Sequence, residues 1–259
     1  MLIGIILLCG IYELIAYLTS YKVVPELFLT IYKMFILMAD NDTWINLGYS
    51  IMRVIIVLFI STFIGYFLGL LAGFFSQIEV ILKPMIYFLT SIPTVSLILV
   101  LLIYTKVTTY VIVFLITFPL IYKSTLEGSK IILKDYRDII TIEGRHSINN
   151  FTKVLCPLSL PYLFIGLSQA SALGLKVELM SEVFISNTNL KGIGTLINIS
   201  FLNLEMTDLF GYTFISVLFM IIIEIVIHFI KRELELKYGI TTSKSITFNL
   251  IKKNQTNTK

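Results

Sequence analysis

The chain has 259 residues, of which 57% are hydrophobic and 14% are charged, and its mean hydropathy is +0.91. A soluble domain keeps roughly a quarter of its residues charged, so this composition excludes a protein whose whole surface faces water. The formal net charge is +4, but no basic run is interleaved with aromatic residues, so we expect no nucleic-acid partner. The composition predicts an all-α membrane protein in a lipid bilayer, with room for about six spans of roughly 20 residues each.

Six apolar segments follow one another, at residues 2–20, 46–75, 83–103, 107–122, 157–185 and 209–230. Spans of a β-barrel would alternate in polarity over about ten residues, whereas these runs are continuous, so helices are predicted. Pro84 and Pro93 predict that the third segment is kinked or built from two pieces. The first segment lacks the flanks of a cleaved signal peptide and is expected to be a retained helix. Gly65, Gly69 and Gly73, four residues apart, predict close helix packing.

The basic residues predict the orientation. If both termini are cytoplasmic, fourteen basic residues lie inside, and four lie outside: Lys22, Lys33, Lys106 and Lys191. The positive-inside rule therefore favours this topology for a multi-pass membrane protein. We expect a transmembrane region over residues 1–240, a cytoplasmic stretch at about 123–156, and a polar cytoplasmic tail over 241–259 that is disordered.

No catalytic or metal cluster is visible in the sequence. Cys9 and Cys156 lie far apart, so neither a disulfide framework nor a metal site is expected. The two histidines form no catalytic group with other residues, and no phosphate-binding Walker A pattern is present. We therefore expect a protein that is not an enzyme and holds no cofactor of its own.

The cytoplasmic stretch mixes charged and apolar residues, which predicts one or two short amphipathic helices broken at Gly144. From Asp138 it reads Asp-Ile-Ile, then three residues, then Gly144, and nine residues later Val154-Leu155-Cys156-Pro157. This spacing resembles the EAA loop of permeases in binding-protein-dependent ABC importers, which has Glu-Ala-Ala, a Gly and a Leu-Pro at these places. Ile139 and Ile140 depart from it, because the family has small residues there.

Five further elements resemble the permease subfamily for nitrate, sulfonates and taurine, in the same order. They are Val24-Pro25, Tyr49–Val54, Ser91-Ile92-Pro93, Ser181–Phe184 and Gly192-Ile193-Gly194. The resemblance implies a type I ABC importer permease fold in a bacterial inner membrane, with a homodimeric pore built from two copies of the chain. It also implies a cytoplasmic ABC ATPase that holds the ATP, an extracytoplasmic substrate-binding protein, and a small solute of the subfamily's kind or a vitamin precursor. The ATPase contact would involve Asp138, Ile139, Ile140, Gly144, Arg145, Val154 and Pro157.

Charged residues inside predicted spans form the second group of candidates, because each costs roughly 2.5–3.5 kcal/mol at the bilayer centre. Lys176, Glu178 and Glu182 share the fifth segment and are candidates for the translocation path. Glu178 and Glu182 lie four residues apart, so at least one should be paired, protonated or near water. The alternative is a helix end that reaches the interface. For Arg53 we favour a side chain that extends outward to the membrane surface over one that contacts the substrate.

A self-sufficient secondary carrier is the alternative from another class of protein. It would need its own coupling-ion site, discontinuous helices and corresponding repeats in two halves. The sequence shows no such repeat, and the cytoplasmic loop would have no purpose in a carrier. The permease of an ATP-driven importer is therefore the favoured prediction.

Overall fold

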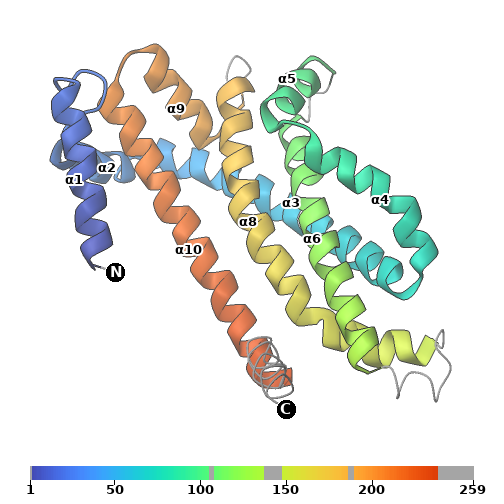
Figure 1. Cartoon of the computed structure of the whole chain (residues 1–259). Helices are drawn as coiled ribbons and strands as arrows, with labels where there is room; N and C mark the ends of the chain where they lie inside the picture. The colour runs from blue at the N-terminus through green and yellow to red at the C-terminus, as the bar shows by residue number, and fades with distance from the viewer. Residues whose placement is uncertain (1, 105–107, 137–147, 186–189, 239–259) are drawn as a thin grey trace. The chain divides into compact units, whose positions relative to one another are not determined.

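The computed structural model of the chain describes residues 2–104, 108–136, 148–185 and 190–238, and every element in these ranges is helical (Figure 1). Long continuous apolar runs form helices in lipid because a helix satisfies its backbone hydrogen bonds internally. The elements are α1 (Leu2–Leu18), α2 (Leu27–Met38), α3 (Asn41–Phe74), α4 (Ser76–Ser91), α5 (Thr94–Tyr104), α6 (Thr108–Asp135), the π-helix η1 (Asn150–Leu155), α8 (Cys156–Ile185), α9 (Ile193–Leu202) and α10 (Met206–Tyr238).

Within the described residues, four helical stretches are long and apolar enough to cross a membrane: α3, α6, α10 up to Ile230, and the continuous run of η1 and α8. The pair α4 and α5 adds a fifth if it is one interrupted span. Helix α1 is apolar but shorter. The predicted all-helical membrane fold is confirmed, and the count of six spans stays a prediction.

The third apolar segment consists of two helices. This is one of the two arrangements that its prolines predicted, a kinked helix being the other. The interruption falls at Ile92-Pro93, between α4 and α5, whereas Pro84 lies inside α4. The proline ring disfavours helical dihedral angles at the residue before it, which explains a break at Ile92.

Helix α6 differs from the expected fourth segment, because it continues past residue 122 to Asp135 with Pro119 inside it. The buried positions Ile121, Thr125, Ser129 and Ile132 follow one another at helical spacing, so the packed face is unbroken along this stretch. The predicted boundary relied on hydropathy alone, and the added turns carry lysines on their other faces.

The chain divides into two compact units. Unit 1 contains Met1–Phe59, Ile92–Leu115 and Ala172–Ile223. Helix α2, the first half of α3, α9 and α10 enclose its core, which is formed by Met34, Leu37, Leu47, Ile193 and Ile215. Aromatic contacts join α1 and α3 to α10, since Tyr12 packs on Phe210 and Trp44 packs on Phe219, with ring centroids 6.1 and 5.6 Å apart.

Unit 2 contains Ile60–Ser91, Ile116–Ser171 and Glu224–Lys259. Its core is formed by Leu70, Phe74, Ile132 and Leu155. The glycine series of α3 faces α6 at short range: a Cβ on Gly73 would lie 2.3 Å from Ser129 Cβ, and one on Gly69 would lie 2.8 Å from Thr125 Cβ. Neither position has space for a side chain, so the packing role predicted for this series is confirmed.

Candidate functional site

A buried cluster of charged residues lies within unit 1, where α3, α8 and the segment before α9 meet. Helix α3 contributes Asn46, Ser50 and Arg53, which share one face because they are four and three residues apart. Helix α8 contributes Glu178 and Glu182, one turn apart on the same face. The side chains of Arg53, Glu178 and Glu182 are 7%, 1% and 0% exposed, so their charges interact away from water.

The guanidinium of Arg53 joins the two helices and the segment before α9. Its Nε donates to Oε1 of Glu178 at 2.6 Å, and its Nη2 donates to Oε1 of Glu182. The same Nη2 donates to the backbone oxygen of Lys191 at 2.7 Å. The expectation that Arg53 extends to the membrane surface is therefore wrong. The fork of guanidinium donors suits carboxylates, and two of them lie within reach inside the protein.

Glu182 is the better satisfied of the two carboxylates. The hydroxyl of Ser50 lies 2.7 and 2.9 Å from its two oxygens, and the backbone N–H of Gly194 donates to Oε2 at 2.8 Å. Glu178 accepts from Arg53 through Oε1, whereas its Oε2 has no hydrogen-bond partner among the described residues. The prediction that at least one of these glutamates is paired is confirmed.

The segment that leads into α9 contributes three consecutive backbone N–H groups. Gly192 N–H donates to Oδ1 of Asn46 at 2.9 Å, Ile193 N–H donates to Oγ of Ser50 at 3.0 Å, and the third, from Gly194, reaches Glu182. A helix begins with unpaired N–H groups, and here α3 and α8 supply their acceptors. The positive end of the α9 dipole also favours the negative charge of Glu182.

Gly192 and Gly194 are required by this close approach. A Cβ on Gly192 would lie 2.4 Å from Cδ of Glu182 and 2.6 Å from Nη2 of Arg53. A Cβ on Gly194 would lie 2.6 Å from the backbone oxygen of Leu179 and 2.7 Å from Cβ of Glu182. The Gly-Ile-Gly sequence thus lets the backbone touch the buried carboxylate, which no larger residue allows without displacement.

The arrangement fixes three segments to one another through charge. One guanidinium and two carboxylates meet there, so a cluster with both acids ionised carries one net negative charge. Charges inside spans are expected to face the protein interior and to pair with one another. The hydroxyl of Ser50 is held between Glu182 and the Ile193 amide, so the polar groups of the cluster bind one another and balance charge.

The remaining predicted site residues lie in different places. Asp138, Ile139, Ile140, Gly144 and Arg145 fall at 137–147, outside the described residues. Val154 is half-buried in η1, and Pro157 is the second residue of α8, which directly continues η1. Lys176 is exposed on α8, about 200° around the helix from Glu178, and does not join the cluster.

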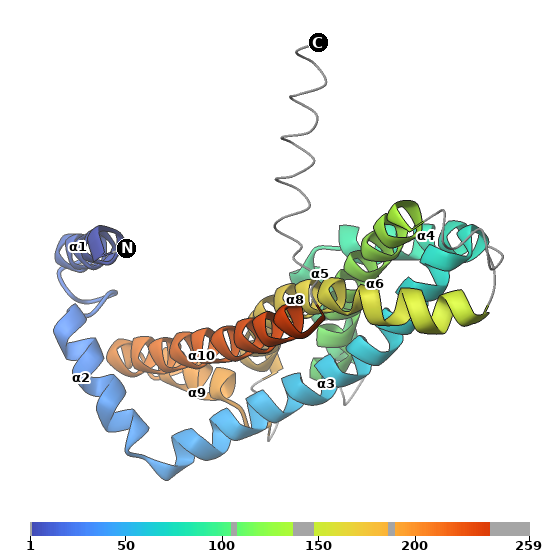
Figure 2. The same ribbon diagram turned by 90° about the horizontal axis from the view of Figure 1, so that it is seen from below.

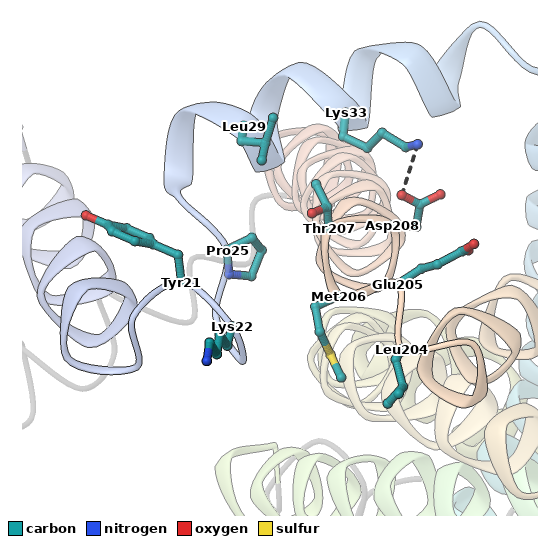
Figure 3. Close-up of a pocket in the computed structure, with 10 residues that line it drawn as sticks. All are labelled: Tyr21, Lys22, Pro25, Leu29, Lys33, Leu204, Glu205, Met206, Thr207 and Asp208. Carbon is teal, nitrogen blue, oxygen red and sulfur yellow. Dashed lines mark ion pairs between the residues drawn. The ribbon is translucent and has the colours of Figure 1, made fainter.

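An open pocket of about 460 Å³ lies elsewhere in unit 1, where the α1–α2 connection faces the α9–α10 connection (Figure 3). Lys33 from α2 and Asp208 from α10 form an ion pair of 3.0 Å on its wall. Tyr21 and Leu204 line it as well, and both have left-handed backbone conformations, with φ of 57° and 60°. Such dihedrals are uncommon for residues other than glycine, so both connections have tightly defined turns.

Comparison with known proteins identifies the family. Residues 61–238 match the model of the binding-protein-dependent transport system inner membrane component. The chain belongs to this family of permease components, which are parts of transport systems and not enzymes. It is also 27% identical over 138 residues to two bicarbonate transport system permease proteins, both called CmpB, from Synechococcus elongatus and a Synechococcus species. The match covers 52% of this chain and 49% of each relative, so the chain spans about half the length of these curated relatives.

Sequence reasoning identified Glu182 and the Gly-Ile-Gly element separately and did not connect them with Arg53. A signal was available, because Arg53 and Glu178 are opposite charges in two different predicted spans, and each needs a partner in lipid. Asn46 was missed, because an amide near a span end carries no signal until its backbone partner is known.

Proposed function

We propose that this chain forms the translocation pathway of an ATP-driven importer for a small solute, as one of two copies. The family match over residues 61–238 carries the proposal, since it covers the stretch from the middle of α3 to the end of α10. In this proposal a separate cytoplasmic ATPase binds and hydrolyses the ATP, and an extracytoplasmic binding protein delivers the solute. Both termini are proposed to be cytoplasmic, on the distribution of basic residues.

The segment from Asp138 to Pro157 is proposed to contact the ATPase. Its C-terminal end supports this role, because it is attached firmly within unit 2. Leu155 is 1% exposed in the core, and the ring of Phe151 packs edge-on against Phe74 at 5.4 Å. The hydroxyl of Tyr66 donates to the backbone oxygen of Cys156 at 2.7 Å. A force applied to this segment would therefore reach the membrane helices rather than be lost in a loose joint.

The proposed solute is a small oxyanion of the bicarbonate or nitrate class. The support is the name of the two relatives, which are bicarbonate permeases, together with the subfamily resemblance. We propose that α8 borders the path through the face that carries Lys176, a cation that is exposed and suits an anionic solute. Glu178 and Glu182 would then hold the opposite face of the same helix in place.

The pocket beside Lys33 and Asp208 is proposed to receive part of the binding protein. Under the predicted topology its two connections lie on the outer side of the membrane. The pocket is open and combines charged and apolar lining residues, as the rim of a transient protein interface does.

The first experiment tests the ATPase contact. The chain is co-expressed with a candidate ABC ATPase, and co-purification is compared for the native chain, Gly144→Trp and Gly10→Trp. Gly10 lies on α1 with nothing within 4 Å of an added Cβ, so it controls for a glycine-to-tryptophan change away from the proposed contact. We expect association to be lost in Gly144→Trp and kept in Gly10→Trp. Absence of any ATPase association, with ion-gradient-driven uptake by the purified chain alone, would support a secondary carrier instead.

The second experiment tests the solute. Proteoliposomes that contain the chain, its ATPase and the binding protein are assayed for ATP-dependent uptake of bicarbonate, nitrate and taurine. We expect an oxyanion to be taken up and Lys176→Gln to reduce its uptake, whereas preferred uptake of taurine or of an uncharged solute would contradict the proposed class.

A further inference from the structure

Unit 2 contains a pocket of about 320 Å³ between α4 and α6, which lie side by side in both ribbon views (Figures 1 and 2). It is within the volume range of small-ligand sites. All of its lining residues come from these two helices, and most of the polar ones are charged. Neither the cluster around Arg53 nor the predicted ATPase contact includes any of them.

The charges of the pocket do not cancel. Lys130 and Glu79 form an ion pair of 2.6 Å and neutralise each other. Lys83 from α4 and Lys123 from α6 also line the pocket, and they face a single remaining carboxylate, that of Glu127. The lining thus has one more positive charge than negative. Within the described part of the chain, neither Lys83 nor Lys123 forms an ion pair.

The two lysines converge on one aromatic ring. The ammonium groups of Lys83 and Lys123 each lie 5.9 Å from the centroid of Tyr87. Lys123 also approaches the hydroxyl of Thr90, at 3.4 Å. Two cations near one aromatic ring raise the local positive potential, and this favours an anion.

A buried hydroxyl adds a neutral donor to the same pocket. Tyr122 is 2% exposed and lines the pocket, and its hydroxyl has no hydrogen-bond partner among the described residues. A buried hydroxyl without a partner costs about 1–3 kcal/mol. A ligand with an acceptor oxygen would remove that cost.

We propose that this pocket binds an anionic oxygen group, either the phosphate of an acidic lipid headgroup or a small free oxyanion. Lys83 and Lys123 would supply charge-assisted hydrogen bonds to it, and Tyr122 would supply a third donor. Under the predicted topology the pocket lies at the cytoplasmic end of α4 and α6. Basic pockets between membrane helices on that side bind acidic headgroups, and imported oxyanions arrive there as well.

The test uses the purified full chain in detergent. Native mass spectrometry measures the retention of phosphatidylglycerol against phosphatidylcholine, and equilibrium dialysis measures the binding of inorganic phosphate. The variants are Lys83→Gln with Lys123→Gln, and Tyr122→Phe, which removes a single oxygen. Lys134→Gln is the matched control, because Lys134 is an exposed lysine of α6 outside the pocket.

We expect the double lysine variant to weaken binding by at least about tenfold, since each contact with a charged group contributes a factor of that order. Tyr122→Phe should weaken binding as well, and Lys134→Gln should not. Binding of phosphatidylglycerol alone assigns the site to a lipid headgroup, and binding of phosphate alone assigns it to a free oxyanion. The proposal is overturned if neither probe binds, or if the double lysine variant binds as tightly as the native chain. None of these measurements needs the ATPase, so their outcome is independent of the proposed importer.

Discussion

The Nε of Arg53 lies 2.6 Å from Oε1 of Glu178, which connects residues that are 125 positions apart in the chain. Through the other arm of the guanidinium, the same side chain reaches Glu182. Helices α3 and α8 therefore cannot slide past each other in this region without breaking both ion pairs. The contribution of the charged cluster can therefore be measured as a change in the stability of the chain, without a transport assay.

Arg53→Gln is expected to destabilise the chain strongly. The variant leaves two buried carboxylates without their cation, and removal of one partner of a buried ion pair costs about 3–5 kcal/mol. Thermal unfolding in detergent measures the effect. Lys176→Gln removes the same charge from an exposed position of α8 and should change the free energy of unfolding by less than about 1 kcal/mol. Equal stability of the two variants would show that the cluster contributes little.

The two glutamates should differ when each is changed to glutamine. Glu182→Gln disturbs contacts with Arg53, Ser50 and the Gly194 amide, so a loss of about 3–5 kcal/mol is expected. Glu178→Gln disturbs one contact, with Nε of Arg53, and removes the excess negative charge of the cluster. Its loss should be about 1.5–3 kcal/mol, the value of one hydrogen bond to a charged group. A larger loss for Glu178→Gln, in the same unfolding assay, would reverse the ranking derived from these contacts.

Much of the fold follows from the sequence, because hydropathy over long windows locates helices whose solvent is lipid. The starts of the predicted segments are less accurate: α3 begins at Asn41 rather than at residue 46, since polar residues at its N-terminus continue the helix outside the apolar run. The end of α6 was missed for the same reason. Hydropathy reports the environment of a residue, and a helix that extends beyond an apolar run gives no hydropathy signal there.

The cluster was only partly predictable. A charged residue in a span implies that it has a partner, but the sequence does not identify which residue that partner is. The spacing of Glu178 and Glu182 indicated mutual repulsion. The arginine that pairs with both carboxylates belongs to another helix. Arg53 was instead assigned to the surface, since its distance from the helix start in sequence resembled that of a residue near an interface. The depth of a side chain depends on what surrounds its helix, and one sequence does not contain that information.

Gly194→Ala should be harmful, and Gly48→Ala should not. The new methyl group at 194 would overlap the backbone oxygen of Leu179 and the side chain of Glu182, whereas nothing lies within 4 Å of a Cβ at 48. Alanine inside a helix is favoured over glycine by about 0.8–1.0 kcal/mol, so Gly48→Ala should raise the midpoint of thermal unfolding slightly. Gly194→Ala should lower it. The prediction fails if both changes shift the midpoint in the same direction.

Lys33→Ala tests the outer pocket. The side chains of Lys33 and Asp208 are 33% and 21% exposed, and surface ion pairs of this kind contribute about 0–1 kcal/mol. Stability should therefore change little. If the binding protein occupies the pocket, its stimulation of ATP hydrolysis by the assembled importer should fall in Lys33→Ala and not in Lys134→Ala, which lies on the opposite predicted side. Unchanged stimulation would place the docking surface elsewhere.

The contact of Gly194 and Arg53 with a single carboxylate also limits how the sequence can change over time. A related chain that loses the acid at position 182 would leave the arginine at 53 without one of its partners and would release position 194 from the need for glycine. These three positions should therefore vary together or not at all across homologues. Substitutions at any one of them would be tolerated mainly in backgrounds where the other two have already changed.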